Sequence, residues 1–303
     1  MAETDIFVDQ PLRFSLPELN ARGRLVRLDA LLADILGTHN YPPAVEKLLA
    51  EALVIAVLLG SLLKDAGGQL TMQAQTENGP IRLLVCDFKQ STVRGHVQFD
   101  ADAVAALPVN TSLFALFGKG FLAITFDQEK QMGSEGRYQG IVPLEGESLA
   151  HATEYYFAQS EQLPTLLRVA VDHVDGKCVA AGMIVQHLAE GEEGRERLHT
   201  KMDHPAWEHV RALGETISAD ELVDPGLSMQ DIIWRLFHES EIRVENGTFL
   251  TKGCRCDIGH IRNVIGKFPA DERAEMANDA GDILVHCEFC SKDFPLSLNS
   301  FNN

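Results

Sequence analysis

The sequence predicts an α+β protein with three parts: an N-terminal, largely antiparallel sheet with packed helices, a helical linker segment, and a small cysteine-rich module at the C-terminus. Three observations support this fold class. Short strand-like runs joined by tight turns recur in the first 186 residues, which favours antiparallel pairing. An acid-rich stretch with apolar residues at loosely helical intervals follows. Four of the six cysteines then lie within the last fifty residues.

The length and composition of the chain agree with this division. A chain of 303 residues with 45% hydrophobic content can bury a large core. We expect an α+β core domain over residues 1–186 and a metastable acidic helical linker over residues 187–228. A C-terminal domain that carries the paired cysteines should then cover residues 229–303.

Two helices are expected near the N-terminus. Residues 25–36 carry an amphipathic helical pattern. The prolines of Asn40-Tyr41-Pro42-Pro43 suit the first turn of a long helix that extends to about Lys64. Gly67-Gly68 can end this helix, because glycine readily takes the left-handed conformation of a C-cap.

The strands of this domain are expected to be short and connected mainly by turns. Asn78-Gly79-Pro80 marks a turn between the first two strands, and Asp175-Gly176 is a strong two-residue hairpin signal between the last two. A helix is expected over residues 147–157. The predicted strands cover residues 69–75, 81–88, 92–99, 121–126, 166–174 and 177–186.

The linker segment differs in composition from the domain before it. From His187 to Asp224, acidic residues are frequent and large apolar residues are few. Ser218-Ala219-Asp220-Glu221 is a capping box, which predicts that a helix begins there. Composition alone fits a solvated helical connector, and the alternative is a segment that is folded on its neighbours with little stability to spare. A denser apolar face over residues 230–238 leads to the cysteines.

Cys254-Arg255-Cys256 and Cys287-Glu288-Phe289-Cys290 form two close pairs, separated by 30 residues. Two pairs of thiolates suit one tetrahedral zinc ion, so the sequence predicts a small C-terminal zinc-binding module. Four sulfur ligands leave no position for a reactive water, so metal-based hydrolysis is not expected. Sulfur can instead be oxidised. A structural zinc site, a redox-sensing zinc site and structural disulfides therefore all remain open from the residues alone.

The cellular location bears on which of these is expected. The start of the chain, Met1 to Asp5, is acidic and lacks the basic and apolar segments of a signal peptide. The longest strongly apolar run, residues 52–63, is too short to span a bilayer. We therefore expect a cytoplasmic protein with no membrane partner, in which thiols stay reduced unless stress intervenes.

Signals of several other functions are missing. The formal net charge of −18 would repel phosphate, so nucleic-acid binding is not expected. No phosphate-binding Gly-x-x-x-x-Gly-Lys-Ser/Thr motif occurs, and Gly146-Glu147-Ser148 lacks the second glycine of a nucleophile elbow. We therefore do not expect an enzyme. Cys86 and Cys178 lie apart from the two pairs and are expected to be buried structural thiols.

The arrangement of Cys-x-Cys, about thirty residues, and Cys-x-x-Cys resembles the redox-regulated 33 kDa heat-shock protein family, which are bacterial holdase chaperones. The resemblance covers nearly the whole chain. Asp257-Ile258-Gly259 departs from it, because a serine followed by basic residues is more usual after the first pair. The other resembling stretches are residues 39–42, 48–52, 140–149, 156–165 and 235–239.

This resemblance implies a metal site and a switch. In the reduced state Cys254, Cys256, Cys287 and Cys290 would hold one Zn²⁺ per chain, and the C-terminal domain would be a redox-sensing zinc domain that braces the linker. Oxidation would join Cys254 with Cys256 and Cys287 with Cys290, expel the zinc, and unfold the linker and the zinc module. The active form would bind unfolded or misfolded proteins without ATP, as a homodimer.

Two readings from other classes compete with this one. The chain could be a zinc-stabilised protein-binding or nucleic-acid-binding module without redox switching, or a zinc-dependent enzyme. Zinc release during peroxide treatment, followed together with suppression of client aggregation, distinguishes them.

Overall fold

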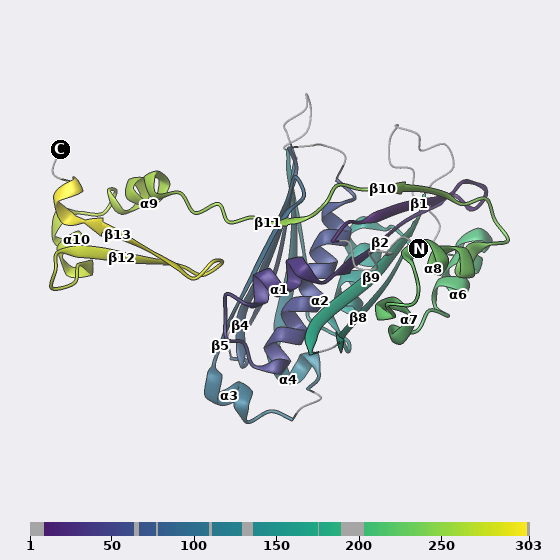
Figure 1. Cartoon of the computed structure of the whole chain (residues 1–303), viewed down its shortest axis with the longest axis horizontal. Helices are drawn as coiled ribbons and strands as arrows, with labels where there is room; N and C mark the ends of the chain where they lie inside the picture. Colours follow the sequence, from purple (N-terminus) through teal and green to yellow (C-terminus); the bar gives the residue numbers. More distant parts are fainter. Residues whose placement is uncertain are drawn as a thin grey trace.

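The computed structural model describes residues 9–63, 67–76, 78–108, 111–128, 136–174, 176–188 and 203–301. One long helix, α2 (Pro43–Gly60), lies between two β-sheets. Three short helices cover the outer face of the first sheet, and a cysteine-rich module extends from the edge of the second (Figure 1). The predicted α+β fold class, with largely antiparallel sheets and packed helices, is confirmed.

The first sheet has five strands in the order β10-β1-β2-β9-β8, and the second has six in the order β11-β5-β4-β3-β6-β7. Every neighbouring pair in them is antiparallel except β11 with β5. The strands of the first sheet are β1 (Leu12–Leu16), β2 (Ala21–Leu28), β8 (Thr165–Val174), β9 (Lys177–His187) and β10 (Arg243–Asn246). Those of the second are β3 (Gln69–Thr76), β4 (Ile81–Lys89), β5 (Thr92–Phe99), β6 (Gly120–Asp127), β7 (Arg137–Pro143) and β11 (Thr251–Lys252).

Helix α2 is buried on every side because nearly all its residues from Leu48 onward are apolar. It contacts β2, β8 and β9 of one sheet and β3, β4 and β5 of the other. Glycines allow the close approach. A Cβ atom on Gly95 of β5 would lie 2.8 Å from Leu49, and one on Gly182 of β9 would lie 2.6 Å from Val54. The two sheets and this helix therefore form one core.

The helix expected over residues 25–36 is wrong in its first part. Leu25 to Leu28 continue strand β2, and only α1 (Ala30–Leu36) is helical. Strand β2 pairs with β1 on one side and β9 on the other, so its backbone groups are already satisfied as a central strand. Over so short a stretch, closely spaced apolar residues fit the period of a helix as well as that of a strand. The pairing of these residues with β1 and β9 makes them a strand.

The long helix was expected to reach about Lys64 and to end at Gly67-Gly68, but α2 ends at Gly60 with Ser61 as its C-cap. The other predicted elements of this domain agree with the structure. All six predicted strands are present, and Val174 pairs with Lys177 across the predicted two-residue hairpin turn, of which Asp175 lies outside the described residues. The helix expected over residues 147–157 is α5 (Leu149–Tyr156), and the Ser148 hydroxyl caps it by accepting from the amide of His151. Strands β1 and β7 were not predicted. Helices α3 (Ala101–Ala105) and α4 (Leu113–Phe117) complete the domain.

The linker segment packs against the first sheet instead of standing in solvent. We call α6 (Pro205–Gly214), α7 (Ala219–Val223) and α8 (Met229–Phe237) the middle helices. They lie at the right of Figure 1 and share an apolar cluster with β1, β2, β8 and β9. The predicted capping box at Ser218 is present and begins α7. The solvated connector is therefore wrong for this part, while residues 189–202 lie outside the described residues.

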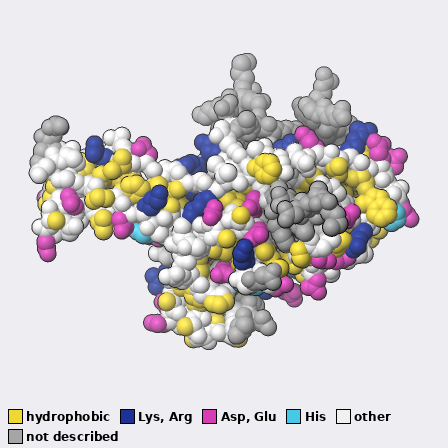
Figure 2. Space-filling view, viewed as in Figure 1, with side chains coloured by type: hydrophobic (Ala, Val, Ile, Leu, Met, Phe, Trp, Pro, Cys, Tyr) yellow, Lys and Arg dark blue, Asp and Glu magenta, His cyan; other side chains and the backbone are white. Residues whose placement is uncertain are grey.

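Charged and apolar side chains are mixed on the surface that Figure 2 shows. Basic side chains are scattered among acidic and apolar ones on this face and do not form a stripe. In the described part of the chain, no helix combines the length and apolar character needed to cross a membrane.

Candidate metal centre

The four paired cysteines come from two loops of the cysteine module, which we define as residues 253–301. Cys254 and Cys256 lie between β11 and α9 (Ile258–Ile265). Asp257 caps α9 by accepting from the amides of Gly259 and His260, so the first pair directly precedes a helix start. Asp257, directly after the first cysteine pair, thus has a local role as a helix cap.

The second pair lies at the turn of a hairpin. Strand β12 (Asp282–Cys287) pairs with β13 (Lys292–Ser297), and the carbonyl of Cys287 accepts from the amides of Cys290 and Ser291. This turn places the two thiols side by side. Helix α10 (Ala270–Met276) lies between the two cysteine loops in sequence and contacts β12.

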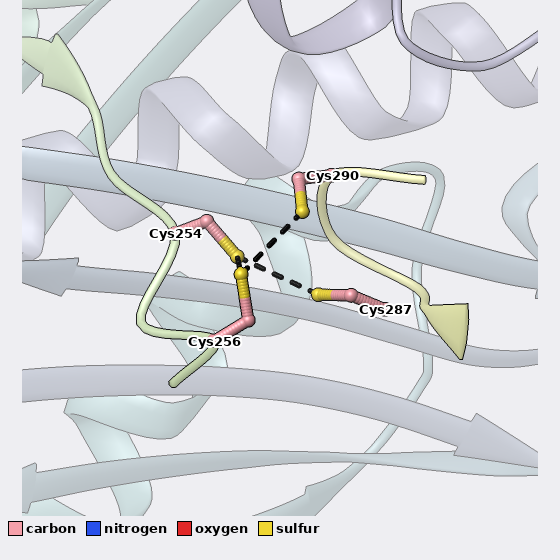
Figure 3. A group of neighbouring side chains, drawn as sticks. All are labelled: Cys254, Cys256, Cys287 and Cys290. Carbon is pink, nitrogen blue, oxygen red and sulfur yellow. Dashed lines mark hydrogen bonds between the residues drawn. The ribbon is translucent and has the colours of Figure 1, made fainter. Parts of the chain in front are cut away.

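The four sulfur atoms all lie within 4.8 Å of one another (Figure 3). The Cys254 sulfur lies 3.2 Å from that of Cys256 and 3.5 Å from that of Cys287, and the Cys256 sulfur lies 3.7 Å from that of Cys290. Sulfurs around a tetrahedral zinc ion are about 3.8 Å apart, because each Zn–S bond is about 2.3 Å long. The donor set and its spacing therefore fit a closed tetrahedral site for zinc.

The acidity of the thiols also favours a cation here. Burial opposes ionisation of Cys254, but hydrogen bonds from the thiol and amide of Cys256 and from the other two thiols lower its pKa to about 7. Burial, together with the contacts to Cys254 and Cys290, raises the pKa of Cys256 to about 12, and burial raises that of Cys287. The Cys254 thiolate thus forms readily, and its negative charge opposes the ionisation of the other thiols. A bound divalent cation would offset the repulsion between the thiolates.

The two remaining cysteines are buried, as predicted. Burial raises the pKa of Cys86 well above its ordinary value and that of Cys178 to about 12. Cys178 does lie near Glu46 and His173, a group with ligand atoms close enough for a metal. However, Glu46 already accepts from His173 at 2.9 Å and from the protonated Cys178 thiol. Hydrogen bonding therefore accounts for this cluster without a metal.

Between the middle helices and the metal centre, the chain follows the edges of both sheets. We call residues 243–253 the strap. Strand β10 pairs with β1, the buried Leu250 joins the main core, and β11 pairs in parallel with β5. The amide of Gly253 donates to the carbonyl of Val93 directly before the first cysteine. The strap thus joins the middle helices to the cysteine module and is itself paired to the edges of both sheets.

One buried arginine was missed by the sequence analysis. Arg27 of β2 is 0% exposed and donates to backbone carbonyls of the middle-helix region: Leu222 at 2.6 Å, Glu221 at 3.0 Å, and Leu227. These carbonyls lie near the C-terminal end of α7, where a helix leaves acceptors unsatisfied. A charged residue inside the run Leu25 to Leu28 was the available signal.

Comparisons with known proteins agree with this geometry. The sequence model of a family described as Hsp33 protein matches residues 9–297. A Caulobacter vibrioides protein named 33 kDa chaperonin is 40% identical, over 97% of this chain and 96% of its own length. A Salmonella typhi protein of the same name is 35% identical, over 94% and 91%.

The fold has a counterpart among solved structures. The crystal structure of a 33 kDa chaperonin from Thermotoga maritima superposes with a TM-score of 0.79 and covers 97% of this chain and 96% of its own chain. The two sequences are 22% identical, so this likeness supports the fold.

Proposed function

The chain belongs to the Hsp33 protein family, and from this premise we propose that it is a redox-regulated, ATP-independent holdase chaperone of the cytoplasm. The family and the name that its relatives share support a chaperone, a class of proteins that are generally not enzymes. The redox switch is our proposal for this chain. The observation that carries it is the closed cluster of four thiols at 3.2–3.7 Å, which can bind a metal or be oxidised.

In the reduced state, Cys254, Cys256, Cys287 and Cys290 would hold one Zn²⁺ per chain. Zinc would keep the sulfurs as thiolates and contribute folding free energy, roughly 10–16 kcal/mol in small zinc modules. The functional division that we propose is a core domain over residues 1–186, a metastable linker over residues 187–228 and a redox-sensing zinc domain over residues 229–303. In this state the middle helices cover the apolar face of the first sheet.

Oxidation would convert the two pairs separately. In each pair, two thiolates would give two electrons to a peroxide, whose oxygens leave as water after taking up protons, and a sulfur–sulfur bond would form. The resemblance to the family implies that the bonds are Cys254 with Cys256 and Cys287 with Cys290, and we propose this pairing here. Disulfide sulfur lacks the negative charge of a thiolate, so the pairs would no longer bind zinc or be held to each other.

Loss of the link between the pairs would release the rest of the regulatory region. The cysteine module has little core of its own, so it would unfold, and the strap and middle helices would lose an anchor. Apolar side chains such as Phe14, Leu166 and Met183 would then be uncovered on the first sheet. This surface could bind unfolded or misfolded proteins, and pairing of two such surfaces is consistent with a homodimer in the oxidised state.

A paired assay tests the proposal. Zinc release is followed with a chromogenic chelator during peroxide treatment, while the same samples are tested for suppression of aggregation of a thermally unfolded client without nucleotide. We expect both to rise together and both to reverse with reductant and zinc. Zinc release without chaperone activity would instead favour a zinc-stabilised protein-binding or nucleic-acid-binding module without redox switching.

Hydrogen exchange measures which parts of the chain unfold on oxidation. Oxidised protein should lose protection over roughly residues 187–290, because the middle helices and the module depend on the same metal centre. The strands before this region should change little. Equal protection in the two states would contradict the switch even if zinc were released.

A further inference from the structure

Each cysteine pair encloses a side chain that contacts the second sheet. Arg255 lies between Cys254 and Cys256, and Phe289 lies between Cys287 and Cys290. Arg255 binds Asp87 of β4, Phe289 lies against Arg94 of β5, and Asp87 and Arg94 form an ion pair with each other. Two loops about thirty residues apart in sequence therefore converge on one site outside the module.

Asp87 is the centre of this site and is only 4% exposed. It accepts from the hydroxyl of Thr71 at 2.7 Å and from Nε of Arg94 at 2.7 Å. Nη2 of Arg255 donates to the same carboxylate at 2.7 Å, while its Nη1 donates to Gln69. Charge-assisted bonds of this kind are among the stronger hydrogen bonds in proteins.

Phe289 provides the second contact. The guanidinium carbon of Arg94 lies 4.0 Å from the centre of the Phe289 ring, in the geometry of a cation–π interaction. The ring of His96 meets the same phenyl ring edge-on at 6.2 Å. Arg94 is thus bound to Asp87 on one side and covered by the module on the other.

The site on the sheet does not need the module in order to persist. Thr71 and Arg94 belong to the core domain and by themselves already satisfy the Asp87 carboxylate. Arg255 and Phe289 can therefore leave without stranding a buried charge, which a purely structural ion pair would do. Such a site is suited to reversible docking.

Docking through two loops depends on how those loops are held. When the first loop is bound, the second is close at hand and binds with a high effective concentration, provided that their spacing is fixed. In this protein the spacing of the loops is set by the four sulfurs. Two separate disulfides would leave each loop intact but would no longer hold one at a fixed distance from the other.

We propose that Asp87 and Arg94 form a docking site that detects whether a metal ion holds the two cysteine pairs together, with Arg255 and Phe289 as the two positioning residues. This inference rests on the proposed redox function and names the contact by which the metal centre controls the rest of the chain. The docked module holds β11 against β5, and through the strap it restrains the middle helices.

The test uses the reduced, zinc-loaded full chain with Arg255→Gln and Phe289→Ala, singly and together. Neither substitution removes a sulfur ligand, so zinc content should stay at one per chain. The strap amides should exchange about ten- to a hundredfold faster in Arg255→Gln, the effect of losing one charge-assisted hydrogen bond. The double variant should be less affected than the product of the two single effects, because the two contacts cooperate.

Asp87→Asn tests the partner on the sheet, and Asp172→Asn is its control. Asp172 is an exposed residue of β8 in the first sheet, and its carboxylate accepts from the amide of His173. We expect faster strap exchange in Asp87→Asn and no change in Asp172→Asn. If Asp87→Asn disturbs the sheet itself, Arg255→Gln still decides the matter, since Arg255 belongs to the module.

The outcomes separate this inference from the function on which it rests. Parent-like strap exchange in the zinc-loaded Arg255→Gln and Phe289→Ala double variant would overturn the docking site, even if oxidised parent protein protects clients. Faster strap exchange in these variants would support it, whether or not the oxidised parent shows chaperone activity. Fully multiplicative single effects would also contradict the proposal, since they would show that the two loops dock independently.

Discussion

The middle helices and the cysteine module both pack against the core domain, but different forces stabilise them. The middle helices bury large apolar side chains: Trp207 is 3% exposed and Val210 is 0% exposed. Within residues 253–301, by contrast, helices α9 and α10 bury no residue, and the buried side chains are Ile283, Cys290 and Leu296. The first region therefore depends on apolar burial, and the second on its four sulfurs.

This difference explains how oxidation of the cysteine module could also affect the middle helices. A change at sulfur removes most of what stabilises the cysteine module, because so little apolar surface is buried there. The middle helices keep their apolar contacts and lose only an anchor, so their release depends on how strongly they are docked. Substitutions in the two regions should consequently have effects of different size.

The largest effect is expected from loss of a metal ligand. Cys287→Ser should abolish zinc binding and unfold the cysteine module, at a cost of up to about 10–16 kcal/mol of folding free energy. Metal analysis and hydrogen exchange measure both effects. Cys178→Ser is the matched control, because Cys178 is buried in the core domain and should be dispensable for zinc. Full zinc retention in Cys287→Ser would refute the assignment of the ligands.

The next effect concerns apolar docking of the middle helices. Replacing Trp207, Val210 and Leu213 together by alanine should weaken docking by about 5 kcal/mol, since truncation of a buried tryptophan alone costs about 3–5 kcal/mol. Reduced, zinc-loaded protein should then suppress client aggregation. Trp234→Ala is the control, because Trp234 of α8 is 62% exposed. A folded, zinc-loaded triple variant as inactive as the parent would show that docking of these helices is not the restraint.

A smaller effect is expected at the buried arginine. Arg27→Met would leave the carbonyls of Glu221, Leu222 and Leu227 without this donor, weakening docking by about 3 kcal/mol in total. Hydrogen exchange of α7 in the reduced protein measures this. Arg137→Met, on an exposed position of β7, should leave exchange in α7 unchanged. Unaltered protection of α7 in Arg27→Met would mean that apolar contacts alone hold the middle helices.

The smallest effect is a dependence on pH. His187 is 2% exposed, and its ring lies 4.9 Å from that of His204, the N-cap of α6. Burial, and then the neighbouring His204, lower the pKa of His187 in the docked state. The undocked state, with a pKa of about 6.5, therefore binds the proton first as pH falls. Docking should be fully stable above about pH 6.5 and weaken below it.

Exchange of the α6 amides above and below this pH, corrected for the intrinsic rate, measures the effect. His187→Gln should remove most of the dependence, because glutamine does not titrate. A parent protein whose α6 protection is the same on both sides of pH 6.5 would exclude His187 as a contributor.

The sequence was most informative where a signal is local. The capping box at Ser218, the Asp175-Gly176 turn and strands such as residues 69–75 were visible within a few residues, and the corresponding elements are present. Residues 25–28 were misassigned because a central strand and an amphipathic helix share that short pattern. Strands β10 and β11 gave no signal at all, because four and two residues at a sheet edge carry no period.

The sequence by itself determined the four thiols of the candidate metal centre, because the members of each pair are close along the chain and only the two pairs had to meet. Only the tertiary structure decided where that centre docks and what restrains the middle helices. The contacts of Arg255 with Asp87 and of Arg27 with Leu222 join residues 168 and 195 positions apart. Such partners are chosen by the packing of whole sheets and helices, which a local pattern of residues does not encode.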